Sequence, residues 1–288
     1  MMRRIIRRGT IAGLGLLMLW AQDSAAETPL ERGRYLMQGI VACGNCHTPQ
    51  TPNGPAAGME MAGQMVTDMA LFTAYAPNIT PDPETGIGSW SDDQIVAAIR
   101  DGRRPDGSLI GPPMPIHLYR GMSDRDVRAI VTYLRTVPPV RNAVPKSIYR
   151  IPLPPSYGPP VTAVAEVPRD DQVAYGAYLA GSLGHCIACH TPMINGREDY
   201  ENQLGAGGFV LDGPWGTTIS RNITPHPEDG IAAWANAEIK RAITEGISAD
   251  GGRLAPPMAY GYYRNISDAD LDAVVAYLRT LRPRPSPE

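Results

Sequence analysis

The sequence has few of the residues that build a large apolar core or span a membrane. Only two of its 288 residues are phenylalanine, and aromatic residues make up 7% of the chain. After residue 26, no apolar run reaches the ~20 residues that a membrane-spanning helix needs. The formal net charge is only −3, which argues against binding to nucleic acid or to an anionic membrane surface. The interior therefore needs something besides side chains to fill it.

The first 26 residues have the pattern of a secretory signal peptide. Four arginines precede an apolar run at 11–20, and small residues at 24–26 form a cleavage site. The apolar run is about half as long as a membrane span, although an uncleaved anchor or a buried helix is the alternative. We expect export to the periplasm and a mildly acidic mature chain that begins near Glu27, soluble or held at a membrane through a partner subunit.

The remaining sequence contains two copies of one pattern. GRYLMQGIVACGNCHTP at 33–49 aligns with GAYLAGSLGHCIACHTP at 176–192, and NITPDPETGIGSW at 78–90 aligns with NITPHPEDGIAAW at 222–234. Agreement at so many fixed positions indicates a tandem duplication. Seven prolines between the copies favour a stiff, extended connector. The predicted division is a signal peptide at 1–26, a first copy at 27–142, a proline-rich linker at 143–169, a second copy at 170–282 and a tail at 283–288.

Within each copy the apolar pattern is helical. Ser91 begins a short amphipathic helix that should end near Gly102. Ser123 begins a second helix, whose apolar residues recur at i, i+3, i+4 and i+7. A third helix is expected at 30–41, directly before the first cysteine, and the rest reads as loop. We therefore expect an all-α fold of two tandem domains, each with a few short helices and long loops around a central group.

Each copy contains the pattern C-x-x-C-H, as CGNCH at 43–47 and as CIACH at 186–190. A structural disulfide would leave the histidines unexplained, zinc would need more ligands, and a thioredoxin-like dithiol needs a βαβ context. C-x-x-C-H is the attachment signature of c-type haem, whose vinyl groups bind both thiols while its iron binds the imidazole. We therefore predict two covalently bound haem c groups, held by Cys43, Cys46, His47, Cys186, Cys189 and His190.

Methionine is the best candidate for the second axial ligand of each iron. Met114 in GPPM and Met258 in APPM lie at equivalent positions. The remaining histidines, His117, His185 and His226, have no histidine counterpart in the other copy, and we expect His185 to be exposed. Methionine is often only a core residue. A duplicated methionine in a proline-fixed loop is better explained as a thioether ligand, and methionine–histidine ligation raises the potential.

Other features are weaker signals. Asn78 and Asn222 each begin Asn-Ile-Thr-Pro, where the amide could bind a haem propionate or close an Asx turn before proline. Trp90 and Trp234 are expected to pack on the porphyrin edge. Arg100 has no basic counterpart in the second copy, so we expect it on a solvated helix face.

Taken together, CGNCHTP, NITPDPETGIGSW, GPPMP and DVRAIVTYLRT resemble class I cytochrome c modules. They are most similar to those in the cytochrome c subunits of periplasmic alcohol- and aldehyde-type dehydrogenases. The resemblance covers nearly the whole mature chain. It implies crossing terminal helices around each haem, with Met opposite His. It also implies that Gly33 and Gly176 let these helices approach those bearing Tyr133 and Tyr277. Many such subunits carry three haems and a membrane-associating tail, whereas this sequence has two haem motifs and ends in PRPSPE. This difference weighs against direct quinone reduction at a membrane.

These observations predict an electron-transfer protein rather than an enzyme. If both axial positions of each iron are filled, no iron is open to substrate, so no catalytic residue is expected. The expected donor is a periplasmic dehydrogenase, and the expected acceptor is a cytochrome, an oxidase or a quinone-linked protein. Neither a nucleic-acid partner nor a transmembrane segment in the mature chain is expected. The alternative is a di-haem enzyme, such as a thiosulfate dehydrogenase or a peroxidase, with one open or labile iron ligand. The near symmetry of the two copies argues against it.

Overall fold

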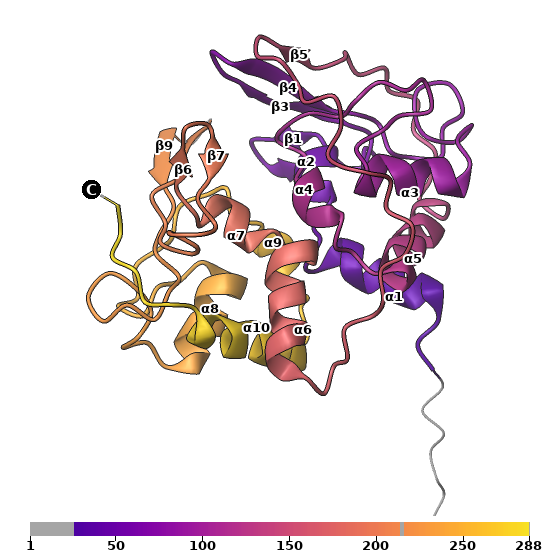
Figure 1. The fold of residues 1–288 in the computed structure, drawn as a ribbon. Helices are drawn as coiled ribbons and strands as arrows, with labels where there is room; N and C mark the ends of the chain where they lie inside the picture. The colour runs from indigo at the N-terminus through magenta and orange to yellow at the C-terminus, as the bar shows by residue number, and fades with distance from the viewer. Residues whose placement is uncertain (1–25, 214–215, 288) are drawn as a thin grey trace, which may run out of the picture.

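The structure is a computed structural model that describes residues 26–213 and 216–287 (Figure 1). The predicted signal peptide lies, apart from its last residue, outside the described residues. Within them, no helix combines the length and the apolar character needed to cross a bilayer. In Figure 1 the first copy, in indigo to magenta, lies beside the second copy, in orange to yellow.

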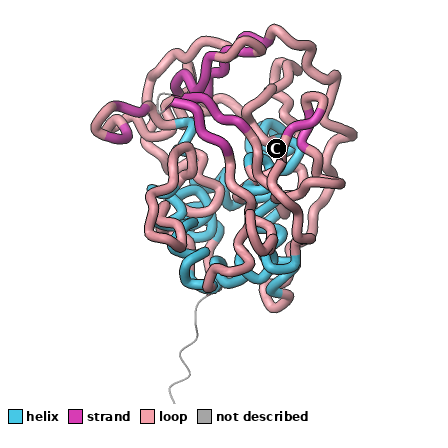
Figure 2. Tube along the Cα trace, turned by 90° about the vertical axis from the view of Figure 1, so that its left-hand side faces the viewer, coloured by secondary structure: helices cyan, strands magenta, loops and turns pink. Residues whose placement is uncertain are grey.

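Helices form the centre of each copy. The first copy contains α1 (Pro29–Gln38), α2 (Gly44–His47), α3 (Asp92–Arg100), α4 (Ile116–Tyr119) and α5 (Asp124–Leu134). The second copy contains α6 (Gln172–Tyr178), the π-helical turn η1 (Leu179–Leu183), α7 (Cys186–Cys189), α8 (Asn236–Glu245), α9 (Tyr260–Tyr263) and α10 (Asp268–Thr280). Figure 2 shows that the helices gather toward one end of the molecule, while most strands lie toward the other.

The helix starts follow from capping residues that the sequence displays. Ser91 accepts a hydrogen bond from the backbone N–H of Gln94, whose side chain accepts from the N–H of Ser91, so α3 begins with a capping box. Ser123 likewise accepts from the backbone N–H of Asp126 at the start of α5. After α3, Gly102 adopts a left-handed backbone with φ 63°, as a glycine just beyond a helix end commonly does. The predicted starts of both helices, and the predicted end of α3, are confirmed.

The all-α prediction is wrong, because the loops of the described residues contain four small antiparallel sheets. The sheets pair β1 (Gln50–Thr51) with β2 (Gly54–Pro55), β4 (Phe72–Ala76) with both β3 (Gln64–Asp68) and β5 (Ile148–Tyr149), β6 (Met193–Ile194) with β7 (Arg197–Glu198), and β8 (Val210–Gly213) with β9 (Gly216–Ile219). One hairpin had a local signal that our interpretation overlooked. Asn195 and Gly196 both have positive φ, at 53° and 78°, as a two-residue hairpin turn requires.

In each copy the first helix crosses the last at a glycine. A Cβ atom on Gly33 of α1 would lie 2.0 Å from the carbonyl oxygen of Ala129 in α5. A Cβ atom on Gly176 of α6 would lie 1.9 Å from the carbonyl oxygen of Ala273 in α10. The same atoms would lie 2.9 Å from the Cβ atoms of Tyr133 and Tyr277, on the helices that the resemblance to cytochrome c modules implied as neighbours. Close approach at both glycines is therefore confirmed.

We expect Gly33→Ala and Gly176→Ala each to lower the free energy of unfolding by about 1–3 kcal/mol or more. The added methyl group meets a backbone oxygen, so the two helices must separate. Urea unfolding measures the change. The control is Gly261→Ala, because a Cβ atom there meets nothing within 4 Å. If the control lost as much stability as the two variants, the close-packing explanation would be refuted.

The two copies are joined by a reciprocal pair of tyrosine contacts, which we call the tyrosine clasp. Tyr35 of α1 donates a hydrogen bond to Asp270 Oδ2 of α10 at 2.7 Å, and Tyr178 of α6 donates to Asp126 Oδ2 of α5 at 2.8 Å. Each hydroxyl also accepts, at 3.0 Å, from the backbone N–H of the N-cap residue of the helix it reaches, Ser267 and Ser123 respectively. Each copy thus holds the start of the other copy's last helix.

Candidate functional site

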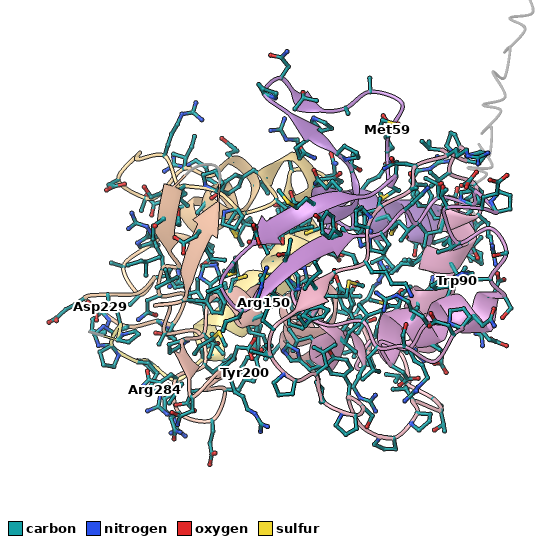
Figure 3. All side chains as sticks on the ribbon, turned by 90° about the horizontal axis from the view of Figure 1, so that it is seen from above. Met59, Trp90, Arg150, Tyr200, Asp229 and Arg284 are labelled. Carbon is teal, nitrogen blue, oxygen red and sulfur yellow. The ribbon has the colours of Figure 1, made fainter. Side chains whose placement is uncertain are left out.

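A cavity of about 930 Å³ runs between the two copies and is lined by both. All eight residues predicted from the sequence line it: Cys43, Cys46, His47, Met114, Cys186, Cys189, His190 and Met258. Figure 3 views the molecule from above, with Trp90 of the first copy and Arg284 beyond the second copy on opposite sides. Arg150 and Tyr200 lie near the middle of that view. Because all eight residues line the same cavity, the candidate residues of the two copies face one shared space.

The cysteines lie on single helical turns at the cavity wall. In each motif one turn of helix, α2 or α7, brings the two cysteines to the same region. None of the four is in a disulfide. Burial, with a smaller contribution from the neighbouring cysteine of the motif, raises the pKa of Cys43 and of Cys186 to about 12. A reactive redox dithiol has a lowered thiol pKa, so the thiol environment does not favour that alternative.

Both motif histidines are fixed by a backbone carbonyl. Nδ1 of His47 lies 2.8 Å from the carbonyl oxygen of Pro77, and Nδ1 of His190 lies 2.6 Å from that of Arg221. A carbonyl only accepts, so Nδ1 carries the proton and Nε2 keeps its lone pair. Burial lowers the pKa of both imidazoles, which favours the neutral form. This is the arrangement in which histidine binds a metal, and neither carbonyl partner was identifiable from the sequence.

The two candidate methionines occupy equivalent loops. Met114 follows a cis peptide bond between Pro112 and Pro113, and Met258 follows the equivalent cis bond. Each methionine carbonyl accepts a hydrogen bond from the backbone N–H two residues on, at 2.8 and 2.9 Å. In the first copy, Tyr149 of β5 also donates to the carbonyl of Pro112 at 2.9 Å. The predicted linker thus contributes a strand that supports the Met114 loop, a contact the sequence did not indicate.

The asparagines of the Asn-Ile-Thr-Pro segments close turns. Asn78 Oδ1 accepts from the backbone N–H of Thr80 at 2.9 Å and from its hydroxyl at 2.7 Å. Its Nδ2 donates to the carbonyl of Val140 at 2.7 Å. Asn222 makes the same three bonds, again to a threonine and to a carbonyl beyond the last helix. Of the two interpretations left open, the structure favours the Asx turn, which ties the segment after the last helix to the cavity wall.

Two other predictions about exposure are wrong. His185 is partly buried and lines the cavity, with its ring centroid 6.0 Å from that of Tyr119. Burial lowers its pKa to about 4. Arg100 is 3% exposed and donates to Asp124 Oδ1 at 2.6 Å and to the carbonyl of Met122 at 2.5 Å. Both errors arise because tertiary packing covers polar residues whose burial the local sequence does not show.

The residues around the cavity fit a haem in each copy. The wall is largely apolar and includes Ile87, Trp90, Ile231 and Trp234, as a flat apolar macrocycle requires. Each copy adds two thiols, an imidazole with a free Nε2 and a thioether, which are donors that bind haem and its iron. The wall also includes Arg104, Arg221 and Arg253, whose guanidinium groups suit carboxylates such as propionates.

Comparisons with known proteins agree with this site. The sequence model of the cytochrome c family matches residues 173–282. The chain is 32% identical to the fructose dehydrogenase cytochrome subunit of Gluconobacter japonicus, over 90% of this chain and 54% of that protein. It is 31% identical to the gluconate 2-dehydrogenase cytochrome c subunit of Pantoea cypripedii, over 91% of this chain and 61% of that protein.

A further relative matches along nearly its full length. The diheme cytochrome c-type protein of Cereibacter sphaeroides is 28% identical over 95% of this chain and 98% of that protein. By contrast, the chain spans only part of the dehydrogenase subunits that it matches, about half of the fructose dehydrogenase subunit. Residues 173–282 thus match the cytochrome c family, and the chain as a whole, with its repeated C-x-x-C-H motifs, is similar to a diheme cytochrome c-type protein and to the cytochrome subunits of dehydrogenases.

Proposed function

We propose that this chain is a periplasmic di-haem cytochrome c that carries single electrons from a dehydrogenase to the respiratory chain or to another cytochrome. The observation that carries the proposal is the repetition of one donor set, in both copies, around one shared cavity. Relatives named as cytochrome subunits of dehydrogenases support the class of donor. In this proposal 27–142 and 170–282 each form one haem domain, joined by the linker at 143–169.

The chain's own side chains hold each haem in the proposed arrangement. Cys43 and Cys46 would hold one haem through their thiols, and Cys186 and Cys189 would hold the other. His47 and His190 would offer Nε2 to iron while their Nδ1–H groups stay bonded to backbone carbonyls. Met114 and Met258 would offer their thioether sulfurs to iron. Haem iron, when bound, supplies a reversible one-electron cycle.

Filled axial positions favour a carrier over an enzyme. An enzyme would need one iron left open or held by a labile ligand, with acid–base groups beside it. Here both copies present an equivalent histidine and an equivalent methionine at the cavity wall. The wall beside both donor sets is largely apolar, and backbone carbonyls fix both imidazoles, which limits rearrangement when charge changes. The protein therefore contributes ligation, burial and position.

The direct test is the intact mass of protein matured in a periplasm with a haem c attachment system. We expect the mature chain plus two haems, and one haem fewer for each of C43A/C46A and C186A/C189A, because each cysteine pair anchors its own haem. Control substitution of His226, which is at no predicted ligand position, should leave two haems. A wild-type mass without haem, or with both haems lost together from one double variant, would contradict the proposal.

The carrier function is tested on the same protein. A purified periplasmic dehydrogenase with its substrate should reduce both haems, and an acceptor cytochrome should reoxidise them. Sustained turnover of thiosulfate or peroxide with an artificial electron partner, abolished by a substitution at one haem only, would instead identify an enzyme.

A further inference from the structure

The two cysteine motifs lie close to one another across the boundary between the copies. Burial raises the pKa of Cys189 to about 11, and the nearby thiol of Cys46, in the other copy, adds to the rise. The copies also pack tightly here. A Cβ atom on Gly44, inside the first motif, would lie 2.1 Å from the hydroxyl of Tyr262. A Cβ atom on Gly184, just before the second motif, would lie 2.8 Å from Ile40 Cδ1. We call this region the seam.

Two equivalent tyrosines fill the seam. Tyr119 ends α4 and Tyr263 ends α9, and only 4% and 5% of these residues are exposed. Both line the cavity. Burial raises the pKa of each tyrosine well above its ordinary value, and nearby thiols of the motifs contribute to both shifts. For Tyr263 these thiols include Cys46 of the other copy.

Contacts from both copies converge on this pair. The two tyrosines line the same cavity, and Tyr263 also contributes to the raised pKa of Tyr119, after burial and the motif thiols. The ring of Tyr119 packs edge-on against His185, the residue directly before the second motif. The pair therefore occupies the space between the two predicted attachment sites and contacts both sides.

The hydroxyls of this pair are unusual for buried tyrosines. Among residues 26–213 and 216–287, no hydrogen bond to a protein group contributes to the pKa of either hydroxyl, and neither oxygen is among the enclosed polar atoms that lack a partner. Each hydroxyl therefore opens onto the cavity that both residues line, whereas a buried tyrosine hydroxyl usually bonds a protein group. Because both residues line the cavity, each hydroxyl is available to a group bound there. If these residues only filled space, phenylalanine would serve as well as tyrosine.

We propose that the seam is the junction through which electrons pass between the two haem sites, with Tyr119 and Tyr263 as positioning residues that contact both bound groups and keep their facing edges at a fixed separation. This inference rests on the proposed function. In each crossing, one electron leaves a ferrous centre, which becomes ferric, and reduces the other ferric centre. No bond forms or breaks, and no proton needs to move.

The test uses the full di-haem protein and two readouts besides dehydrogenase-driven activity. The first is the circular dichroism couplet in the Soret band, which reports on the distance and orientation of two neighbouring haems. The second is the rate at which an electron equilibrates between the haems after photoreduction. Wild-type protein should show the couplet and fast equilibration. The double variant Tyr119→Ala with Tyr263→Ala should lose the couplet and equilibrate more slowly.

Two further variants keep the test decisive if the alanine variant folds poorly. Tyr119→Phe with Tyr263→Phe keeps the rings and should retain the couplet while shifting the haem potentials, because only the hydroxyl contacts are lost. The control is Tyr157→Ala, a half-buried tyrosine that bonds the carbonyl of Ile110 at 2.8 Å and lies outside the cavity wall. It should leave the couplet and both potentials unchanged.

Haem content, measured on each sample, distinguishes a failure of the proposed function from a failure of the proposed junction. Wild-type protein without two covalent haems would overturn the proposed function itself. Wild-type protein with two haems but no couplet would overturn only the junction. So would a phenylalanine variant with unchanged potentials, since the hydroxyls would then contact neither bound group.

Discussion

Replacing Asp126 with alanine should lower the free energy of unfolding by about 3–5 kcal/mol, because it leaves a buried arginine without its counter-charge. Arg32 donates through Nε to Asp126 Oδ1 at 2.7 Å and through Nη2 to Oδ2 at 2.9 Å. The two side chains are only 3% and 5% exposed. Asp126 also accepts from Tyr178 in the tyrosine clasp, so the substitution weakens the contact between the copies as well.

Urea unfolding of the haem-loaded protein measures this loss. The matched control is Asp93→Ala, which removes the partner of Arg128 from an ion pair whose side chains are 83% and 61% exposed. Exposed pairs contribute about 0–1 kcal/mol, so the control should change stability little. Equal losses in the two variants would mean that burial of the Arg32–Asp126 pair adds nothing, and the explanation would be withdrawn.

Replacing Met114 or Met258 with leucine should convert one haem from low spin to high spin and lower its potential, while the other haem keeps its spectrum. Leucine conserves volume, so the fold should tolerate it, and the only chemical loss is the thioether that raises the potential of iron. Optical spectra of the oxidised and reduced protein, with a potentiometric titration, follow both centres separately.

Met122→Leu is the control for this experiment. Met122 is fully buried in the core and does not line the cavity, so its replacement should leave both spectra and both potentials as in the wild type. An unchanged spectrum in either the Met114 or the Met258 variant would remove that methionine from the proposed ligand set. The histidine and cysteine assignments would stand independently.

Local signals in the sequence predicted the parts of the fold that local interactions determine. Ser91 and Ser123 begin helices because their hydroxyls accept from backbone N–H groups three residues on. The crossing glycines, Gly33 and Gly176, were indicated by the resemblance to cytochrome c modules. The all-α prediction failed in the loops, where most of the strands pair in short local hairpins and one pair joins distant segments. β4 pairs with β5, which lies in the predicted linker more than seventy residues later along the chain.

The candidate site, like the fold, could be predicted from the sequence only in part. The C-x-x-C-H motifs and the repeated methionines are visible in the sequence, and the structure places all of them on one cavity. The groups that orient them are not visible there. The carbonyls of Pro77 and Arg221 bond the histidines through backbone atoms, and a backbone acceptor leaves no trace in residue type. Tyr119 and Tyr263 acquire their position only when the two copies pack together.

The tyrosine clasp also bears on how the molecule originated. Tyr35 and Tyr178 are equivalent in the two copies, as are Asp126 and Asp270, and each tyrosine contacts the aspartate of the other copy. Reciprocal contact between equivalent residues is the rule of an isologous interface in a two-fold homodimer. The chain is thus laid out as a homodimer whose subunits have been joined end to end.

A chain that joins two subunits has two properties that a homodimer lacks. The second subunit is always present at a high effective concentration, and each subunit can change without the other. Arg32 shows such a difference between the copies. Its equivalent in the second copy is Tyr175, and the two meet between the copies, where Arg32 Nη2 lies 3.5 Å from the Tyr175 hydroxyl. A homodimer of the first copy would bring two buried arginines together at that position, whereas the joined chain places one guanidinium beside a tyrosine.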